Sequence, residues 1–197
     1  DLKTVDSSIK GIIINSPSNP TGGVWSDEAI TKMLEISKAN NWVVISDETY
    51  EELVYDRKFT ALDVLNTIGA EILTIRSMSK TYAMTGWRIG YAFGEKSIIK
   101  AMGKIQGQAT SCANAIGQAA SVEALNGDQS TVEMMIGKFR ERRDLMVSLL
   151  NELPGITCDT PGGAFYAFPD FSAYIGKSFR GEKIDDSFAL SDVILNE

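Results

Sequence analysis

The sequence of 197 residues contains 44% hydrophobic and 23% charged side chains, with 19 Lys and Arg against 26 Asp and Glu. These proportions are typical of one packed globular domain, or of one domain and part of a second. The net charge of −7 and the isoelectric point of about 4.8 argue against nucleic-acid binding, and no apolar run approaches the roughly 20 residues of a membrane-spanning helix.

Histidine and cysteine usage narrows the chemistry. The sequence contains no histidine, which excludes His-based triads, His zinc sites and imidazole acid–base catalysis within this chain, and we expect no metal site. Cys112 and Cys158 lie in unlike contexts, so we predict two separate thiols and a reducing, cytoplasmic location. Proton transfer must therefore come from Lys, Tyr, Asp, Glu or Cys.

The first half of the chain alternates apolar strands with helical patterns. Ser26 is the expected N-cap of a helix that ends near Asn40-Asn41. Uninterrupted apolar strands separated by helices predict an α/β fold whose mainly parallel sheet is covered on both faces. The predicted strands span residues 11–15, 42–46, 72–75 and 89–93.

The second half of the chain, from Glu95 onward, is mainly helical. We expect a left-handed Gly127 to end the second helix of this half, and two strand-like pieces to follow the third. The predicted helices span 96–108, 113–125, 131–153 and 187–196, and the strand-like pieces span 156–158 and 163–168. The predicted organisation is a partial large domain (1–127), a long interdomain helix (128–153) and the start of a small α+β domain (154–197).

The segment Ser77-Met78-Ser79-Lys80 contains a lysine that can form an imine, beside small hydroxylated neighbours. Arg88 follows eight residues later and can return from the next strand to face the same ligand. A guanidinium group bonds two phosphate oxygens at once, and hydroxyl groups supply further donors. The segment thus fits a phosphate-bearing aldehyde cofactor held by Lys80. Considered alone, Lys80 is equally typical of an exposed, solvated lysine, and Arg88 of an arginine in a surface ion pair.

Three further polar residues follow predicted strands, at the edge where open α/β sheets bind ligands. Asp47 comes directly after an apolar strand, so we expect it to be buried and to need a cationic partner. Tyr50 lies about one helical turn later, and Asn19 follows the first strand. Alone, these residues are equally compatible with an N-cap or ion pair, core packing and an Asn-Pro turn. Glu51-Glu52 could mimic an acid–base pair, but we expect a solvated turn.

Together, four ordered motifs resemble the class I/II aminotransferases of pyridoxal-phosphate fold type I, in particular the bacterial aspartate aminotransferase subgroup. The resemblance covers essentially the whole chain and extends to Gly162-Gly163-Ala164-Phe165-Tyr166, which is similar to the family's passage into its small domain. The four motifs are Asn19-Pro20-Thr21-Gly22, Asp47-Glu48-Thr49-Tyr50, Ser77-Met78-Ser79-Lys80 and Gly86-Trp87-Arg88-Ile89-Gly90-Tyr91.

The resemblance implies a role for each matching residue. Lys80 is the implied Schiff-base lysine and proton shuttle, and Asp47 the implied partner of the pyridine nitrogen. Asn19 and Tyr50 are implied at the phenolic oxygen of pyridoxal 5′-phosphate. Phosphate contacts are implied for Ser77 and Arg88, with Ser79 as an additional phosphate or backbone contact. Amino acid and 2-oxo acid substrates, and a homodimer of the intact protein, are implied as well.

The resemblance also implies that this chain is the middle and later part of a longer protein. The phosphate loop, the aromatic residue that stacks on the cofactor ring and the arginine for the substrate carboxylate are then expected outside it. We expect this chain alone to lack transaminase activity. Two other functions stay open for the same fold: C–S β-elimination, and the effector domain of a transcription regulator.

Overall fold

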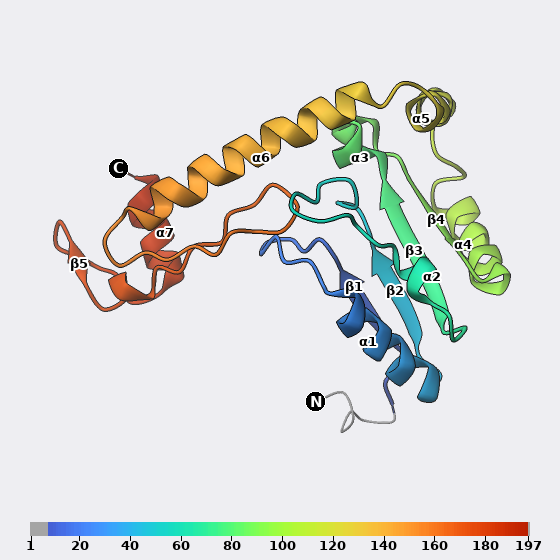
Figure 1. The fold of residues 1–197 in the computed structure, drawn as a ribbon, viewed down its shortest axis with the longest axis horizontal. Helices are drawn as coiled ribbons and strands as arrows, with labels where there is room; N and C mark the ends of the chain where they lie inside the picture. The colour runs from blue at the N-terminus through green and yellow to red at the C-terminus, as the bar shows by residue number, and fades with distance from the viewer. Residues whose placement is uncertain (1–7, 197) are drawn as a thin grey trace.

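The computed structural model describes residues 8–196, and a four-stranded sheet is the centre of the first half (Figure 1). The first three strands are parallel, and the fourth runs antiparallel to the third. The predicted mainly parallel α/β sheet is therefore confirmed. In spatial order the strands are β1 (Gly11–Asn15), β2 (Val43–Asp47), β3 (Glu71–Ser77) and β4 (Gly90–Gly94).

The register of the sheet brings the strand ends that carry polar motifs to one edge. Asn15 at the end of β1 pairs with Asp47 at the end of β2, and Asp47 pairs with Ile75 of β3. Ser77, the last residue of β3, pairs with Gly90 at the start of β4. Residues that follow β1, β2 and β3 and precede β4 therefore meet at this edge.

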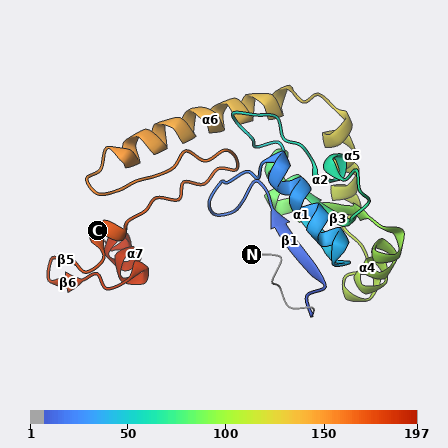
Figure 2. The same cartoon turned by 60° about the horizontal axis from the view of Figure 1, so that its bottom comes forward.

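One face of the sheet is packed by helix α1 (Asp27–Ala39) and the short α2 (Leu62–Leu65), as Figure 2 shows for α1. The predicted N-cap is confirmed, since the Ser26 side chain accepts a hydrogen bond from the amide of Ala29. Apolar side chains at helical spacing meet alternate residues of β1 to β3 in this core, namely Ile14, Ile30, Met33, Leu34, Val44, Leu62, Ala70 and Ile72.

Cover of the second sheet face is uneven among the described residues. Ile12 and Ile14 pack into the α1 core, whereas Ile13 points to the other side of β1 and is 70% exposed. Leu73 shares this second face, since Ile13 pairs with Ile45 and Ile45 with Leu73, and it is 7% exposed. The exposed part of the face is therefore at β1.

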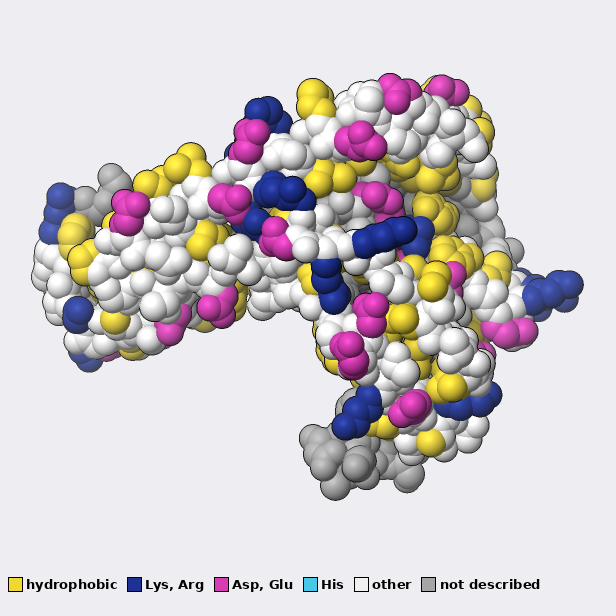
Figure 3. All heavy atoms as spheres, viewed as in Figure 1, with side chains coloured by type: hydrophobic (Ala, Val, Ile, Leu, Met, Phe, Trp, Pro, Cys, Tyr) yellow, Lys and Arg dark blue, Asp and Glu magenta, His cyan; other side chains and the backbone are white. Residues whose placement is uncertain are grey.

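Three helices follow the sheet: α4 (Lys96–Ala109), α5 (Ala115–Asn126) and the long α6 (Ser130–Asn151). No residue of α4 is buried, and hydrophobic side chains gather between α4 and α5 (Figure 3). Gly127 does cap α5 but has φ −79° and ψ −169°, so the predicted left-handed stop is wrong; its amide still bonds the carbonyl of Glu123. None of the described helices is long and apolar enough to cross a membrane.

The chain beyond α6 is mostly irregular. The predicted strands at 156–158 and 163–168 are wrong, because these segments form only single bridges, Thr157 with Asp170 and Val54 with Gly163. Both runs are short, and each pairs at one residue only. The C-terminal region adds a 3-10 turn (Ser172–Tyr174), the hairpin β5 (Ser178–Phe179) and β6 (Glu182–Lys183), and α7 (Ser187–Leu195).

The segment after α6 returns to the sheet edge by a close backbone approach. The amide of Gly163 donates to the carbonyl of Gly22 at 3.0 Å. Gly22 has φ +67°, and a Cβ there would lie 2.3 Å from the Pro161 side chain. Glycine is thus required by both conformation and space. The proposed division at residues 127 and 153 stays a prediction.

Candidate functional site

Lys80 lies at the start of the site, on the short helix α3 (Met78–Thr81) that directly follows β3. Ser77 caps this helix, and its Oγ accepts a hydrogen bond of 3.1 Å from the Ser79 amide. The Lys80 side chain is half-buried, with Nζ 5.4 Å from the ring centroid of Phe165 and 6.0 Å from that of Tyr50. The ring centroids are 5.5 Å apart, so the amine lies beside both aromatic rings at similar distances.

Arg88 comes back to the same segment because β4 is antiparallel to β3. Its Nη1 donates to the Thr85 carbonyl at 2.9 Å, and the Thr85 hydroxyl donates to the Ser79 carbonyl at 3.1 Å. The guanidinium is otherwise exposed, and Arg88 has φ +53° and ψ +50°. A left-handed conformation costs free energy for a residue other than glycine, so the fold around Arg88 holds it in place.

Asp47 differs from the prediction, since it is half-buried rather than buried. Its Oδ1 accepts both the amide (3.2 Å) and the hydroxyl (2.7 Å) of Thr49. Both of these bonds go to one oxygen, so Oδ2 accepts none from the described residues. The carboxylate is thus oriented by Thr49 and keeps one oxygen for a ligand.

The fully buried carboxylate is the neighbouring Glu48, which has 0% exposure. Its Oε2 accepts two hydrogen bonds from Arg76, at 2.8 and 3.0 Å. Its Oε1 accepts from the Ser46 hydroxyl and the Leu62 amide. The sequence argument about burial after a strand therefore applied to the wrong residue. β-strand alternation would have found Glu48, because it continues the inward series of Val44 and Ser46.

The acidic pair Glu51-Glu52 was also misjudged, because Glu51 is not solvated. Its Oε2 is buried without a hydrogen-bond partner among the described residues. Burial, together with the negative charges of Glu52 and Glu48, raises the pKa of Glu51 to about 7, against the opposing effect of a backbone hydrogen bond and Arg76. Near neutral pH, the Glu51 carboxyl group is therefore about half protonated, and it lies close enough to Arg76 to interact with its charge.

Tyr50 is buried at the centre of the site, with 4% exposure. Its hydroxyl lies 2.5 Å from the hydroxyl of Tyr166. Burial, the largest cause, and the negative charge of Asp47 raise the pKa of Tyr50 above its usual range. The hydroxyl therefore stays protonated and keeps a proton to donate.

Phe165 and Tyr166 were not among the predicted site residues. The Phe165 ring packs edge-on against Tyr50 at 5.5 Å and stacks on Phe139 of α6 at 5.4 Å. The preceding Ala164 is fully buried, and its amide donates to the Leu53 carbonyl at 2.8 Å. Their motif was visible in the sequence, but its return to the Tyr50 turn is a long-range contact that no local pattern predicts.

Asn19 is the predicted residue that lies apart from the other site residues. Its amide donates to Asn15 Oδ1 at 2.7 Å, and its side chain is exposed. It follows β1 at the same edge of the sheet as Asp47. No hydrogen bond joins it to the other site residues within residues 8–196.

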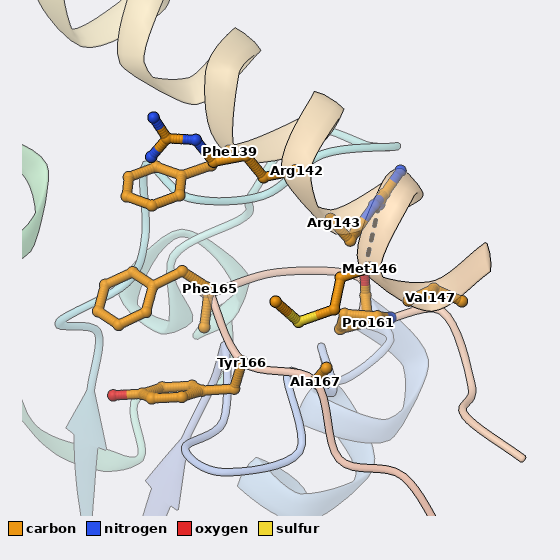
Figure 4. A pocket seen from close by; sticks show the side chains of 10 residues that line it. Phe139, Arg142, Arg143, Met146, Val147, Pro161, Phe165, Tyr166 and Ala167 are labelled. Carbon is orange, nitrogen blue, oxygen red and sulfur yellow. Dashed lines mark hydrogen bonds between the residues drawn. The ribbon is translucent and has the colours of Figure 1, made fainter. Parts of the chain in front are cut away.

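A separate cavity of about 130 Å³ lies beside this cluster, between α6 and residues 161–167 (Figure 4). Its lining is mainly apolar, with Arg142 and Arg143 from α6. Arg143 donates to the Pro161 carbonyl at 3.1 Å and pairs with Asp56. Phe165 and Tyr166 border both this cavity and the site around Lys80, and Phe139 and Ala164 also line the cavity.

The residues at the sheet edge fit pyridoxal phosphate by the chemistry of their donors. Lys80 offers an amine for the aldehyde, and Asp47 has an oxygen to spare for a protonated ring nitrogen. Tyr50 is a buried hydroxyl donor for a phenolate oxygen. Two serines and an exposed guanidinium at one helix start suit a phosphate. The described residues hold no cluster of three metal-ligating side chains. The prediction of two separate thiols is confirmed, since Cys112 and Cys158 are both free.

Comparison with known proteins supports this assignment. The family model described as aminotransferase class I and II matches residues 1–197. A probable aspartate/prephenate aminotransferase of Rhizobium leguminosarum bv. phaseoli is 43% identical, over 99% of this chain and 50% of the relative. The aspartate/prephenate aminotransferase of Cereibacter sphaeroides is 44% identical, over 95% of this chain and 48% of the relative.

Solved structures agree with the sequence relatives. The crystal structure of the aspartate aminotransferase from Rhizobium meliloti superposes with a TM-score of 0.94 at 38% identity, covering 100% of this chain and 50% of that one. An alanine aminotransferase from Pyrococcus furiosus gives a TM-score of 0.82 at 29% identity, over 93% of this chain and 48% of that one. The chain thus spans about half the length of the relatives it matches.

Proposed function

Since the chain belongs to the class I and II aminotransferases, we propose that the protein transfers amino groups between an amino acid and a 2-oxo acid with pyridoxal 5′-phosphate. The observation that carries the proposal is the position of Lys80, whose amine lies beside the Phe165 and Tyr50 rings at the ligand-binding edge of the sheet. Aspartate is the proposed amino donor, because relatives at 43–44% identity are named aspartate/prephenate aminotransferases.

Four residues are proposed to hold the cofactor at its aldehyde and its phosphate. Lys80 binds the aldehyde carbon through its amine. Ser77 and Ser79 supply hydroxyl donors at the start of α3, and Arg88 faces the phosphate with a guanidinium that, among residues 8–196, bonds Thr85 alone. A rigid arrangement of this kind fixes the reactive end of the cofactor relative to Lys80.

The ring is proposed to be held by residues that follow β1 and β2. Asp47 Oδ2 keeps the pyridine nitrogen protonated, while Oδ1 stays bonded to Thr49. Tyr50 donates its proton to the phenolic oxygen, and Asn19 is proposed to donate from the β1 side. These contacts favour the charge distribution in which the ring withdraws electrons best.

The bound cofactor supplies an electron sink for a carbanion at the substrate α-carbon. Lys80 then has the central catalytic role. Its free amine would take a proton from the substrate α-carbon and return it at the cofactor C4′ atom. The rings of Phe165 and Tyr50 lie beside this amine, and no histidine is required.

The quaternary structure is part of the proposal. We expect a homodimer, as the family resemblance implies, and exposed apolar side chains on α4 and α5 support the presence of a covering surface. A cytoplasmic location likewise stays a prediction. Sedimentation of the purified protein tests the dimer.

Titration with pyridoxal phosphate tests the function. A visible absorbance band should form in the parent protein and be lost in Lys80→Ala, while Lys58→Ala, an exposed lysine outside the site, should keep it. In the intact protein, addition of aspartate should then convert the band to that of the amino form of the cofactor. An unchanged band in Lys80→Ala contradicts the proposal.

A further inference from the structure

The Tyr50–Tyr166 hydroxyl pair is not used by the roles proposed above. The two hydroxyls belong to residues 116 positions apart in the sequence and lie 2.5 Å from each other. Their rings meet edge-on at 5.7 Å. One hydroxyl donates and the other accepts, so the direction of this single bond decides where the Tyr50 proton points.

Tyr166 is held firmly enough to set that direction. Its ring packs against Phe165 at 4.8 Å, and Phe165 stacks on Phe139 of α6. The backbone just before it is bonded to the turn that carries Tyr50: Ala164 donates to the Leu53 carbonyl, and the Tyr55 hydroxyl donates to the Ala164 carbonyl. In Figure 4 the Tyr166 hydroxyl points away from Met146 and Val147, out of the apolar cavity.

Charged and titratable groups approach Tyr50 from three segments of the chain. Asp47 lies at the end of β2 and acts on Tyr50 as a negative charge, while Lys80 lies over its ring from α3. Tyr166 faces it from the segment after α6. If Tyr50 donated to Tyr166, its proton would bond the neutral Tyr166 oxygen and could not also bond an anionic oxygen of a ligand.

We propose that Tyr166 is a positioning residue: its hydroxyl donates to the Tyr50 oxygen and so directs the Tyr50 proton to the phenolic oxygen of the cofactor. A hydroxyl that accepts one hydrogen bond becomes a stronger donor in the next, by roughly 10–30% per bond. Tyr166 therefore strengthens a contact that it does not itself make. This inference depends on the proposed function.

The test is a spectroscopic pH titration of the protein loaded with pyridoxal phosphate. Donation to the phenolic oxygen lowers the pKa at which the visible band changes. Loss of that charge-assisted bond in Tyr50→Phe should raise the midpoint by about 1–2 pH units. Tyr166→Phe should raise it by roughly a tenth to a third as much. The double variant should match Tyr50→Phe alone, because Tyr166 acts only through Tyr50.

The sign of the shift separates the alternatives. A lower midpoint in Tyr166→Phe would mean that Tyr166 competes for the Tyr50 proton, and would overturn the inference. An unchanged midpoint, or shifts that add in the double variant, would overturn it too. Tyr174→Phe is the matched control, because it removes a hydroxyl that donates to the Pro154 carbonyl at 2.7 Å, far along the chain from Tyr50; its midpoint should not move.

Two further measurements distinguish a wrong role for Tyr166 from a misfolded variant and from a wrong proposed function. Incorporation of 3-fluorotyrosine in place of Tyr166 keeps the shape but gives a stronger donor, so the midpoint should fall; a rise overturns the inference. Pyridoxamine phosphate has the phenolic oxygen but no aldehyde, and Tyr166→Phe should weaken its binding a few-fold. If the parent protein forms no band that depends on Lys80, the proposed function fails; if it forms one, only the role of Tyr166 is at stake.

Discussion

The sheet region (residues 8–94) and the α4–α5 region (residues 96–126) differ in how far their large apolar side chains are exposed. In the sheet region, Ile30 and Val44 are buried at 1% and 0% exposure. On α4 and α5, Ile105 and Ile116 are 71% and 76% exposed, and none of the α4 residues is buried. The first region forms a core from its own residues, whereas the second presents an apolar surface to something else.

This difference separates the residues proposed to bind the cofactor from a surface that another polypeptide would cover. The proposed cofactor residues all belong to the sheet region, and Phe165 and Tyr166 from the segment after α6 pack against Tyr50. Helices α4 and α5 resemble half of an interface, since isolated monomers rarely expose several large aliphatic side chains together. The contrast leads to four predictions, ordered by expected effect.

The largest effect is expected at Asp47, on the functional edge of the self-packed region. Asp47→Asn removes the charge proposed to hold the ring nitrogen protonated. Loss of one partner of such a pair costs roughly 3–5 kcal/mol, so kcat/KM should fall about 10²- to 10⁴-fold. Asp63→Asn, an exposed carboxylate on α2, is the control and should be neutral. Equal activities of parent and Asp47→Asn would contradict the role of Asp47.

The adjacent Glu48 should affect stability rather than chemistry. Glu48→Ala leaves the Arg76 guanidinium without its carboxylate, and it removes the acceptor of Ser46 and Leu62. The free energy of unfolding should fall by about 3–5 kcal/mol in urea titrations. Glu52→Ala, exposed on the same turn, should change it by less than about 0.5 kcal/mol. Similar values for both variants would refute the buried pair.

A pair of isoleucines tests the comparison itself. In the 197-residue chain, Ile30→Ala should cost about 2–5 kcal/mol of unfolding free energy, because it leaves a cavity in the α1 core. Ile105→Ala should cost less than about 0.5 kcal/mol, because its side chain is already in solvent. Comparable costs would show that the α4 surface is covered in solution by another part or copy of the protein.

The smallest effect is the pH dependence expected from Glu51. Its pKa is raised to about 7 in the fold from an ordinary value of 4.5, so the folded state binds more protons between these values. Stability should therefore decrease as pH rises from about 4.5 through 7, by at most about 3 kcal/mol. Glu51→Gln should remove this dependence and stabilise the protein more at pH 8 than at pH 5. Parallel stability curves for both proteins would contradict it.

The sequence predicted the sheet and its functional edge well, because both depend on local patterns. Neighbouring residues in the sequence determine the uninterrupted apolar strands, the Ser26 cap and the position of Lys80 after β3. The burial of Asp47 was mispredicted because the argument used the nearest carboxylate, and strand alternation selects Glu48 instead. The end of α5 was mispredicted because glycine also adopts extended conformations.

The contacts across the sequence could not be predicted. Tyr166 reaches Tyr50 through backbone bonds from Ala164 to Leu53 and through the close approach at Gly22. Nothing in the local pattern around residue 166 records that return. Similarly, the apolar sequence around Ile13 indicates that a cover is needed but not which polypeptide supplies it.

The most direct measurement of the central claim is chemical trapping at Lys80. The protein is loaded with pyridoxal phosphate, reduced with borohydride, digested and analysed by peptide mass. We expect one saturated modification on the peptide that contains Lys80, with stoichiometry near one per chain. Modification spread over exposed lysines such as Lys58 and Lys96, with Lys80 unmodified, would contradict the account.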